Sequence, residues 1–138
     1  MDEHLLDVLL SECIAVYEEV YQDGMQNPEK AYYGAPPQSV LIACGTSDRG
    51  DDWHPLSKKD ACFRYTAEGL TAVPDDTEPD RTESGMYYRD AYAEWVYHEG
   101  SAILMLVFGK RFARCFRYTV RTDGETVTLT EKKLLWIS

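Results

Sequence analysis

The chain has 138 residues, 44% of them hydrophobic and 12% aromatic; this composition excludes a wholly disordered protein and suffices for one folded domain, residues 1–138. The formal net charge of −10 at pH 7 argues against long-range attraction to nucleic acid or to anionic membranes. The longest apolar run, about eight residues, is too short for a transmembrane helix. The first residues, Asp2, Glu3 and His4, lack the basic character of a signal peptide. We therefore expect a cytoplasmic protein.

The segment Asp2–Gln22 has the period of an amphipathic helix. Apolar residues recur at spacings of three and four and so share one stripe: Leu6, Leu9, Cys13, Val16 and Val20. Gly24 is a residue at which such a helix commonly ends. We expect the apolar stripe to pack on a sheet, and the other side, with Glu12, Glu18 and Glu19, to form an acidic outer face.

Three strands are predicted in the middle of the chain. Ser39–Cys44 and Ala61–Leu70 are two of them. The third, Met86–His98, is compatible with either a strand or a helix. Its aromatic residues and the turn-like pair Glu99–Gly100 favour the strand, whereas its alanines suit a helix. We favour the strand.

The last third of the chain reads as consecutive strands. Ser101–Phe108 is almost continuously apolar, which predicts a central strand covered on both faces. Alternating patterns follow from Phe112 and from Thr126, joined by a predicted hairpin turn at Asp123–Gly124, and the phase blurs at Lys132–Lys133, which predicts a bulge. The predicted fold class is α+β: an N-terminal helix packed on a curved, roll-like antiparallel meander sheet of about five to six strands.

The predicted loops hold further candidate residues. Tyr32 and Tyr33 lie in a loop with several prolines, where they either anchor a partner or fold back over the core. A second loop carries many carboxylates, among them Asp75, Asp76 and Asp80. A third loop clusters Asp48, Asp51, Asp52 and His54, but their spacing fits no calcium-loop pattern. We predict no metal site.

Motifs for catalysis or cofactors are not found in the sequence. It has no glycine-rich phosphate loop, nucleophile elbow or helix-borne zinc pair. The four cysteines, Cys13, Cys44, Cys62 and Cys115, lack the paired spacing of zinc or redox sites and are predicted to be buried, reduced thiols. We therefore expect a protein that is not an enzyme and has no cofactor.

The charge is divided unevenly along the chain. Residues 1–100 hold 21 acidic and 7 basic residues, whereas residues 101–138 hold 3 acidic and 7 basic ones. An acidic surface outside the core strands is attracted to basic protein surfaces, including those of nucleic-acid-binding proteins. The first hypothesis is thus a small interaction protein, an inhibitor of the immunity or phage anti-defence type. The proposed contact residues are Glu12, Glu18, Glu19, Tyr32, Tyr33, Asp75, Asp76 and Asp80.

The alternative hypothesis is a ligand-binding or enzymatic roll with a pocket between helix and sheet. Tyr92, Trp95 and His98 would form its walls, since aromatic residues offer an apolar body and a polar tip. Arg114 or Arg117 would contact an acidic ligand. Core packing of the same aromatic residues is the competing interpretation.

Overall fold

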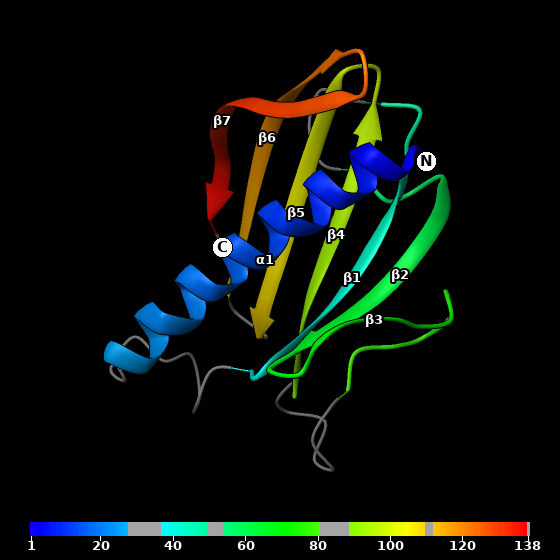
Figure 1. Ribbon diagram of the computed structural model, residues 1–138. Coiled ribbons are helices and arrows are strands. Elements are labelled where there is room, and N and C mark those ends of the chain that lie inside the picture. Colours follow the sequence, from blue (N-terminus) through cyan, green and yellow to red (C-terminus); the bar gives the residue numbers. More distant parts are fainter. Residues whose placement is uncertain (28–36, 50–53, 81–88, 110–111, 138) are drawn as a thin grey trace.

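The computed structural model describes residues 1–27, 37–49, 54–80, 89–109 and 112–137. Within these ranges a long helix, α1 (Glu3–Gln26), crosses one face of a seven-stranded sheet (Figure 1). The strands are β1 (Ser39–Thr46), β2 (Lys58–Thr66), β3 (Gly69–Ala72), β4 (Asp90–His98), β5 (Ser101–Gly109), β6 (Phe112–Asp123) and β7 (Thr126–Ile137). The α+β organisation predicted from the sequence is confirmed.

The sheet order is β3-β2-β1-β4-β5-β6-β7. All neighbours are antiparallel except β1 and β4, which run parallel with Ser39 opposite Asp90 and Thr46 opposite Tyr97. The sheet is therefore mostly antiparallel and consists of two meanders, β1–β3 and β4–β7, joined side by side. The prediction of five to six strands is wrong, because the described residues form seven.

The additional strand arises within the predicted strand Ala61–Leu70. β2 ends at Thr66 and β3 starts at Gly69, and these two residues pair with each other. The backbone N–H of Glu68 donates to Thr66 Oγ1 at 3.1 Å, and Gly69 has a φ of 119°. A Thr side chain that bonds the backbone two residues on stabilises a tight turn, as does a glycine at positive φ. The chain reverses there without the Asn-Gly or Asp-Gly pair by which hairpins are usually recognised.

β4 settles the choice between strand and helix for the segment that precedes β5. Asp90–His98 is a strand paired with β1 and β5, so the helical interpretation is wrong for these residues. Residues 86–88 lie outside the described residues.

The ends of α1 are fixed by side chains. Asp2 Oδ1 accepts hydrogen bonds from the backbone N–H groups of His4 at 2.7 Å and Leu5 at 3.2 Å, which is the usual N-cap arrangement. The helix continues through Gly24, which is buried, so the end predicted there is wrong. The side-chain amide of Asn27 instead donates to the Asp23 carbonyl oxygen at 3.1 Å and closes the last turn.

The core lies between α1 and the sheet. Its centre is Trp95, which is 0% exposed and packs with a ring centroid 5.4 Å from that of Tyr118. The opposite sheet face is also closed at Leu41, Val96 and Ile103. Adjacent residues Ile103 and Leu104 of β5 point to opposite faces and are both buried, as predicted for a central strand.

β6 and β7 form a long, bent hairpin. The turn is at Gly124–Glu125, one residue later than predicted, because Asp123 pairs with Thr126 and Gly124 has a φ of 63°. The predicted bulge near Lys132–Lys133 is confirmed: Glu131 has a φ of 54°, and the ladder shifts register beside it. Figure 1 shows β7 bending sharply along its length.

All four cysteines are buried and none forms a disulfide, as the sequence predicts. Burial raises the pKa of Cys44 to about 12 and holds the pKa of Cys13 well above its ordinary value. Since thiolates are the reactive form, this burial suppresses their chemistry at neutral pH.

Candidate functional site

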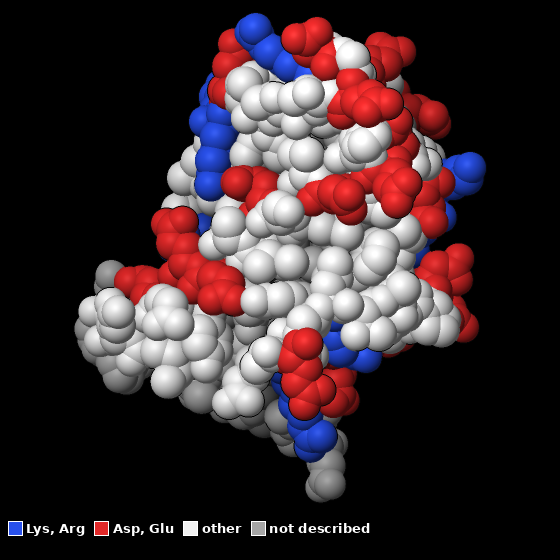
Figure 2. Space-filling model, in the orientation of Figure 1, with Lys and Arg blue, Asp and Glu red and all other residues white. Residues whose placement is uncertain are grey.

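The formally charged side chains of α1 are all negative. Six of its 24 residues are acidic and none is Lys or Arg. Glu3, Asp7, Glu18 and Glu19 are exposed, and we call these four the acidic helix surface. Figure 2 shows carboxylates along the path of α1, whereas Lys and Arg side chains lie around it, at the left edge over β6 and β7, at the right edge and at the bottom of the view.

Of these carboxylates only Glu3, in the first turn, complements the dipole of the helix. Glu3 and Asp7, and likewise Glu19 and Asp23, are like-charged pairs four residues apart, and each such pair costs about 0.2–0.5 kcal/mol. The last turn has no basic residue to complement the helix dipole. Apart from Glu3, the acidic helix surface is therefore not explained by the stability of α1.

Glu12 is turned inward instead. Its carboxylate accepts a short hydrogen bond from Tyr118 Oη on β6, and Lys132 Nζ on β7 lies 3.3 Å from it. The same Nζ lies 4.7 Å from the centroid of the Phe116 ring. Burial and the bond to Glu12 raise the pKa of Tyr118. Glu12 therefore fastens α1 to the β6–β7 hairpin.

Glu18 and Glu19 differ in their surroundings. Glu18 is exposed but accepts a hydrogen bond of 2.7 Å from Tyr65 Oη on β2, and this bond raises the pKa of Tyr65. Glu19 is exposed and has no hydrogen-bond partner among the described residues. Tyr65 thus orients one carboxylate of the acidic helix surface.

The carboxylates of the loop after β3 lie apart from α1. Asp75 and Asp76 are exposed, and the Asp75 carbonyl oxygen accepts a hydrogen bond from Lys59 Nζ at 2.8 Å. Asp80 is anchored by its backbone N–H, which donates to Asp90 Oδ2 at 2.8 Å. Asp90 belongs to the sheet face opposite α1, because its neighbour Ala91 packs in the core beneath α1. The predicted acidic residues thus form two separate groups, while residues 32 and 33 lie outside the described residues.

Asp90 is a residue that sequence reasoning missed. It is 3% exposed, lies 2.9 Å from Arg64 Nη2, and accepts a short hydrogen bond from Ser39 Oγ. It therefore ties the start of β1 and the middle of β2 to β4. Buried carboxylates need such partners. The sequence could have indicated this cluster only if the strand register were known, because the register alone brings positions 39, 64 and 90 together.

The residues proposed for the alternative pocket do not surround one cavity. Tyr92 and His98 lie on the sheet face opposite α1, where Tyr92 Oη donates to the buried Glu94 at 2.6 Å and His98 Nδ1 lies 2.8 Å from the Ser47 carbonyl oxygen. Trp95 lies beneath α1. Arg114 pairs with Leu106, which faces α1, whereas Arg117 pairs with Ile103, which faces the opposite side of the sheet. Because successive side chains of a strand point to opposite faces of the sheet, these five residues are divided between the two faces.

Across the described residues, no three His, Cys, Asp or Glu side chains lie close enough together to hold a metal ion, and positions 51 and 52 of the acidic loop lie outside those residues. Nor does the described part of the chain contain a helix with the length and hydropathy needed to cross a membrane. No family model, curated protein or solved structure matches the chain.

Proposed function

We propose that this chain is an acidic interaction protein whose α1 docks on a basic surface of another protein, in the manner of an inhibitor of the immunity or anti-defence type. One observation carries the proposal: α1 has six carboxylates, no Lys or Arg, and two like-charged pairs four residues apart that cost the helix stability. Residues that lower stability are retained where function needs them.

The carboxylates of the acidic helix surface act at two ranges. At long range they attract a basic partner and speed its association, an effect that salt screens. At short range Glu18, held by Tyr65, is prepared to accept hydrogen bonds from an Arg or Lys of the partner. Glu12 contributes indirectly, since it holds α1 in place.

The loop carboxylates Asp75, Asp76 and Asp80 form a second contact region in this proposal, and Tyr32 and Tyr33 stay proposed contact residues that lie outside the described residues. Asp80 is bonded to the sheet face opposite α1, so a partner that covers only α1 leaves this group free. Neutralising one group at a time therefore separates their contributions.

The test is a comparison of proteins captured from a lysate of the source cell by the native chain and by its Glu18→Gln/Glu19→Gln variant. We expect the native chain to retain a basic protein at low salt and release it at high salt, with recovery reduced at least about tenfold for the variant. Asp75→Asn/Asp76→Asn tests the loop group in the same way.

The matched control is Glu68→Gln/Asp123→Asn, which changes the net charge equally at two exposed turns. It should capture the partner as the native chain does. Equal recovery by all three double variants, or capture that does not depend on salt, would contradict the proposal.

A further inference from the structure

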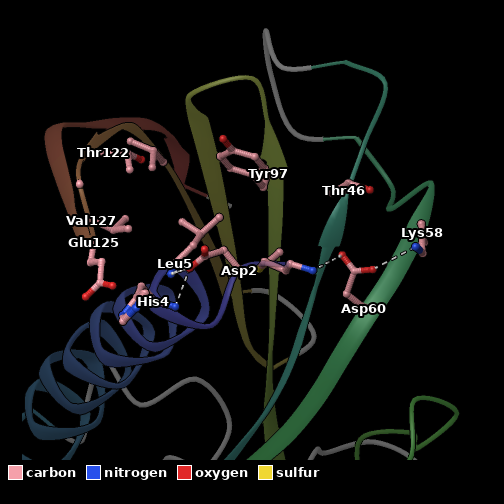
Figure 3. A pocket seen from close by; sticks show the side chains of 13 residues that line it. Asp2, His4, Leu5, Thr46, Lys58, Asp60, Tyr97, Thr122, Glu125 and Val127 are labelled. Carbon is pink, nitrogen blue, oxygen red and sulfur yellow. Dashed lines mark hydrogen bonds and ion pairs between the residues drawn. The ribbon is translucent and has the colours of Figure 1, made fainter.

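The two halves of the last strand, β7, have different surroundings. In the first half, Val127 and Leu129 are partly buried and pack against the core. Val127 also lines a cavity of about 420 Å³ at the N-terminal end of α1 (Figure 3). In that cavity Asp60 is ion-paired with Lys58 at 3.6 Å and with the Met1 amino group at 3.9 Å. The first half of β7 is therefore engaged within the chain.

The second half of β7, which follows the bulge at Glu131, lies at the border of the sheet. β7 is the last strand in the sheet order, so among the described residues no strand pairs with its outer side. We call its last four residues, Leu134–Ile137, the open edge. None of the four is charged, and Leu134 is 47% and Ile137 58% exposed. Unpaired N–H and C=O groups beside exposed apolar side chains are a template on which another chain can add as a strand.

The other border of the sheet is a weaker candidate for such pairing. β3 has 4 residues, whereas β7 has 12. The loop that follows β3 carries the exposed carboxylates of Asp75 and Asp76. Leu70 of β3, which is 41% exposed, therefore serves below as a control position.

The side chains of the open edge point to both faces of the sheet. Leu134 pairs with Phe116 of the core, so it faces α1. On the opposite face Arg117 pairs with Lys133, directly before the open edge. Lys133 is exposed and has no hydrogen bond or ion pair among the described residues. The open edge is therefore apolar on the α1 side and bordered by basic residues on the other side.

These basic residues favour one kind of occupant. Two copies of the chain that paired through the open edge would bring their lysines onto neighbouring strands, where like charges are destabilising. Lysines beside a strand edge are a common protection against such self-pairing. A segment with carboxylates is attracted instead. Screening limits charge interactions to about 8 Å at physiological ionic strength, so the adjacent basic residues count for more than the distant acidic loops.

We propose that the open edge of β7 binds an extended acidic segment of another protein, which adds to the sheet as an eighth strand. The backbone of the segment pairs with the open edge. Its apolar side chains cover Leu134 and Ile137, and its carboxylates lie beside Lys133. This surface is separate from the acidic helix surface, so the proposal does not rest on the proposed function.

The test uses three capped heptapeptides: TVEVEVT, its lysine counterpart TVKVKVT, and TVEVEVT with its five central amides N-methylated. Each is titrated to millimolar concentration into the full chain while amide shifts are followed by NMR. We expect saturable binding of TVEVEVT, with shifts concentrated in β7 and β6. The lysine peptide should bind this edge at least about tenfold more weakly, because its charge is of the wrong sign. The N-methylated peptide should not bind there, because it cannot pair as a strand.

Two exposed sites of β7 and one control locate the contact. Lys133→Gln should weaken the binding of TVEVEVT about threefold, as expected for an exposed ion pair. Leu134→Ser/Ile137→Ser should weaken it at least about tenfold, because apolar contact area is lost. Leu70→Ser, at the other border of the sheet, should leave it unchanged.

The proposal is overturned if TVEVEVT does not bind, or if either of the other peptides shifts the β7 amides as strongly. It is also overturned if Leu70→Ser weakens binding as much as the β7 variants do. Sedimentation of the chain alone should show a monomer. A dimer that Leu134→Ser/Ile137→Ser abolishes would place a second copy at the open edge and would likewise exclude the proposal.

Discussion

Side chains of β1 and β4 are buried on both faces of the sheet, but the two faces differ in the kind of side chain that is buried. Beneath α1 the closure is apolar, with Leu9, Trp95 and Leu104 fully buried. On the opposite face Asp90 and Glu94 are buried beside apolar residues, each with a hydrogen-bond partner. Apolar burial depends on area and volume, whereas a buried carboxylate depends on particular partner atoms. Equal burial therefore implies different sensitivity to substitution.

The largest effect is expected on the α1 side. Trp95→Ala should lower the free energy of unfolding by about 3–5 kcal/mol, because it removes the largest fully buried side chain and leaves a cavity. Urea denaturation followed by circular dichroism measures the change. Trp95→Phe should cost clearly less, since it keeps most of the volume and removes an indole N–H that has no hydrogen-bond partner among the described residues.

On the opposite face the sensitive property is charge rather than volume. Asp90→Asn keeps the shape of the side chain but weakens its bonds to Arg64 and Ser39, and should cost about 2–3 kcal/mol. The control is Asp80→Asn, since Asp80 reaches Asp90 through its backbone N–H and its side chain is exposed. If the two asparagine variants unfold at the same urea concentration, Asp90 is not the anchor described above.

The buried thiols distinguish the faces through pH. Burial raises the pKa of Cys44 from 9.0 to about 12, so its contribution to stability is complete below pH 9 and is lost as pH rises towards 12. Above pH 9 the native chain should therefore lose about 1.4 kcal/mol per pH unit from this group. Urea denaturation at about pH 8 and pH 10 measures this loss of unfolding free energy, which should be smaller for Cys44→Ala than for the native chain.

Cys62 provides the comparison from the opposite face. Burial raises the pKa of Cys62 as well, but Lys59 and Arg64 counteract that rise. Cys62→Ala should therefore reduce the alkaline loss less than Cys44→Ala does. If Cys62→Ala reduced the alkaline loss of stability more than Cys44→Ala does, the two faces would not differ in the way their charges suggest.

The smallest effect is expected outside both faces and has the opposite sign. Glu19→Gln removes a like-charge pair with Asp23 and should raise the free energy of unfolding by about 0.2–0.5 kcal/mol. The gain is small, so thermal denaturation of Glu19→Gln and of Glu68→Gln should be measured side by side. A loss of stability would indicate that Glu19 is held by contacts that α1 itself provides.

Local signals in the sequence were sufficient for much of this fold. The spacing of Leu9, Cys13 and Val16 predicted α1, and the apolar run from Ala102 predicted β5, because both patterns are set by neighbours in the chain. The bulge near Lys132 was also visible as a break in alternation. The α1 carboxylates Glu18 and Glu19 were correctly expected on an exposed side of the helix.

What the sequence did not reveal depends on pairings between distant residues. The parallel contact of β1 with β4 brings Ser39 beside Asp90, and no local pattern encodes that register. The inward turn of Glu12 depends on Tyr118, 106 residues away. The cavity at Asp60 likewise exists only once six elements meet around it. Strand alternation did, however, already indicate that Tyr92 and Trp95 face opposite sides.

The parallel junction of β1 and β4 has a consequence for the order of folding. Each meander closes through short turns, whereas the junction requires Ser39 to find Asp90 across 50 intervening residues. Contacts between residues far apart in sequence slow folding, because loop closure costs entropy before the contacts form. We therefore expect the meander β4–β7 to form early and the addition of β1–β3 to limit the rate. Substitutions at the junction, and those in the β6–β7 turn that forms before the rate-limiting step, should then both slow refolding.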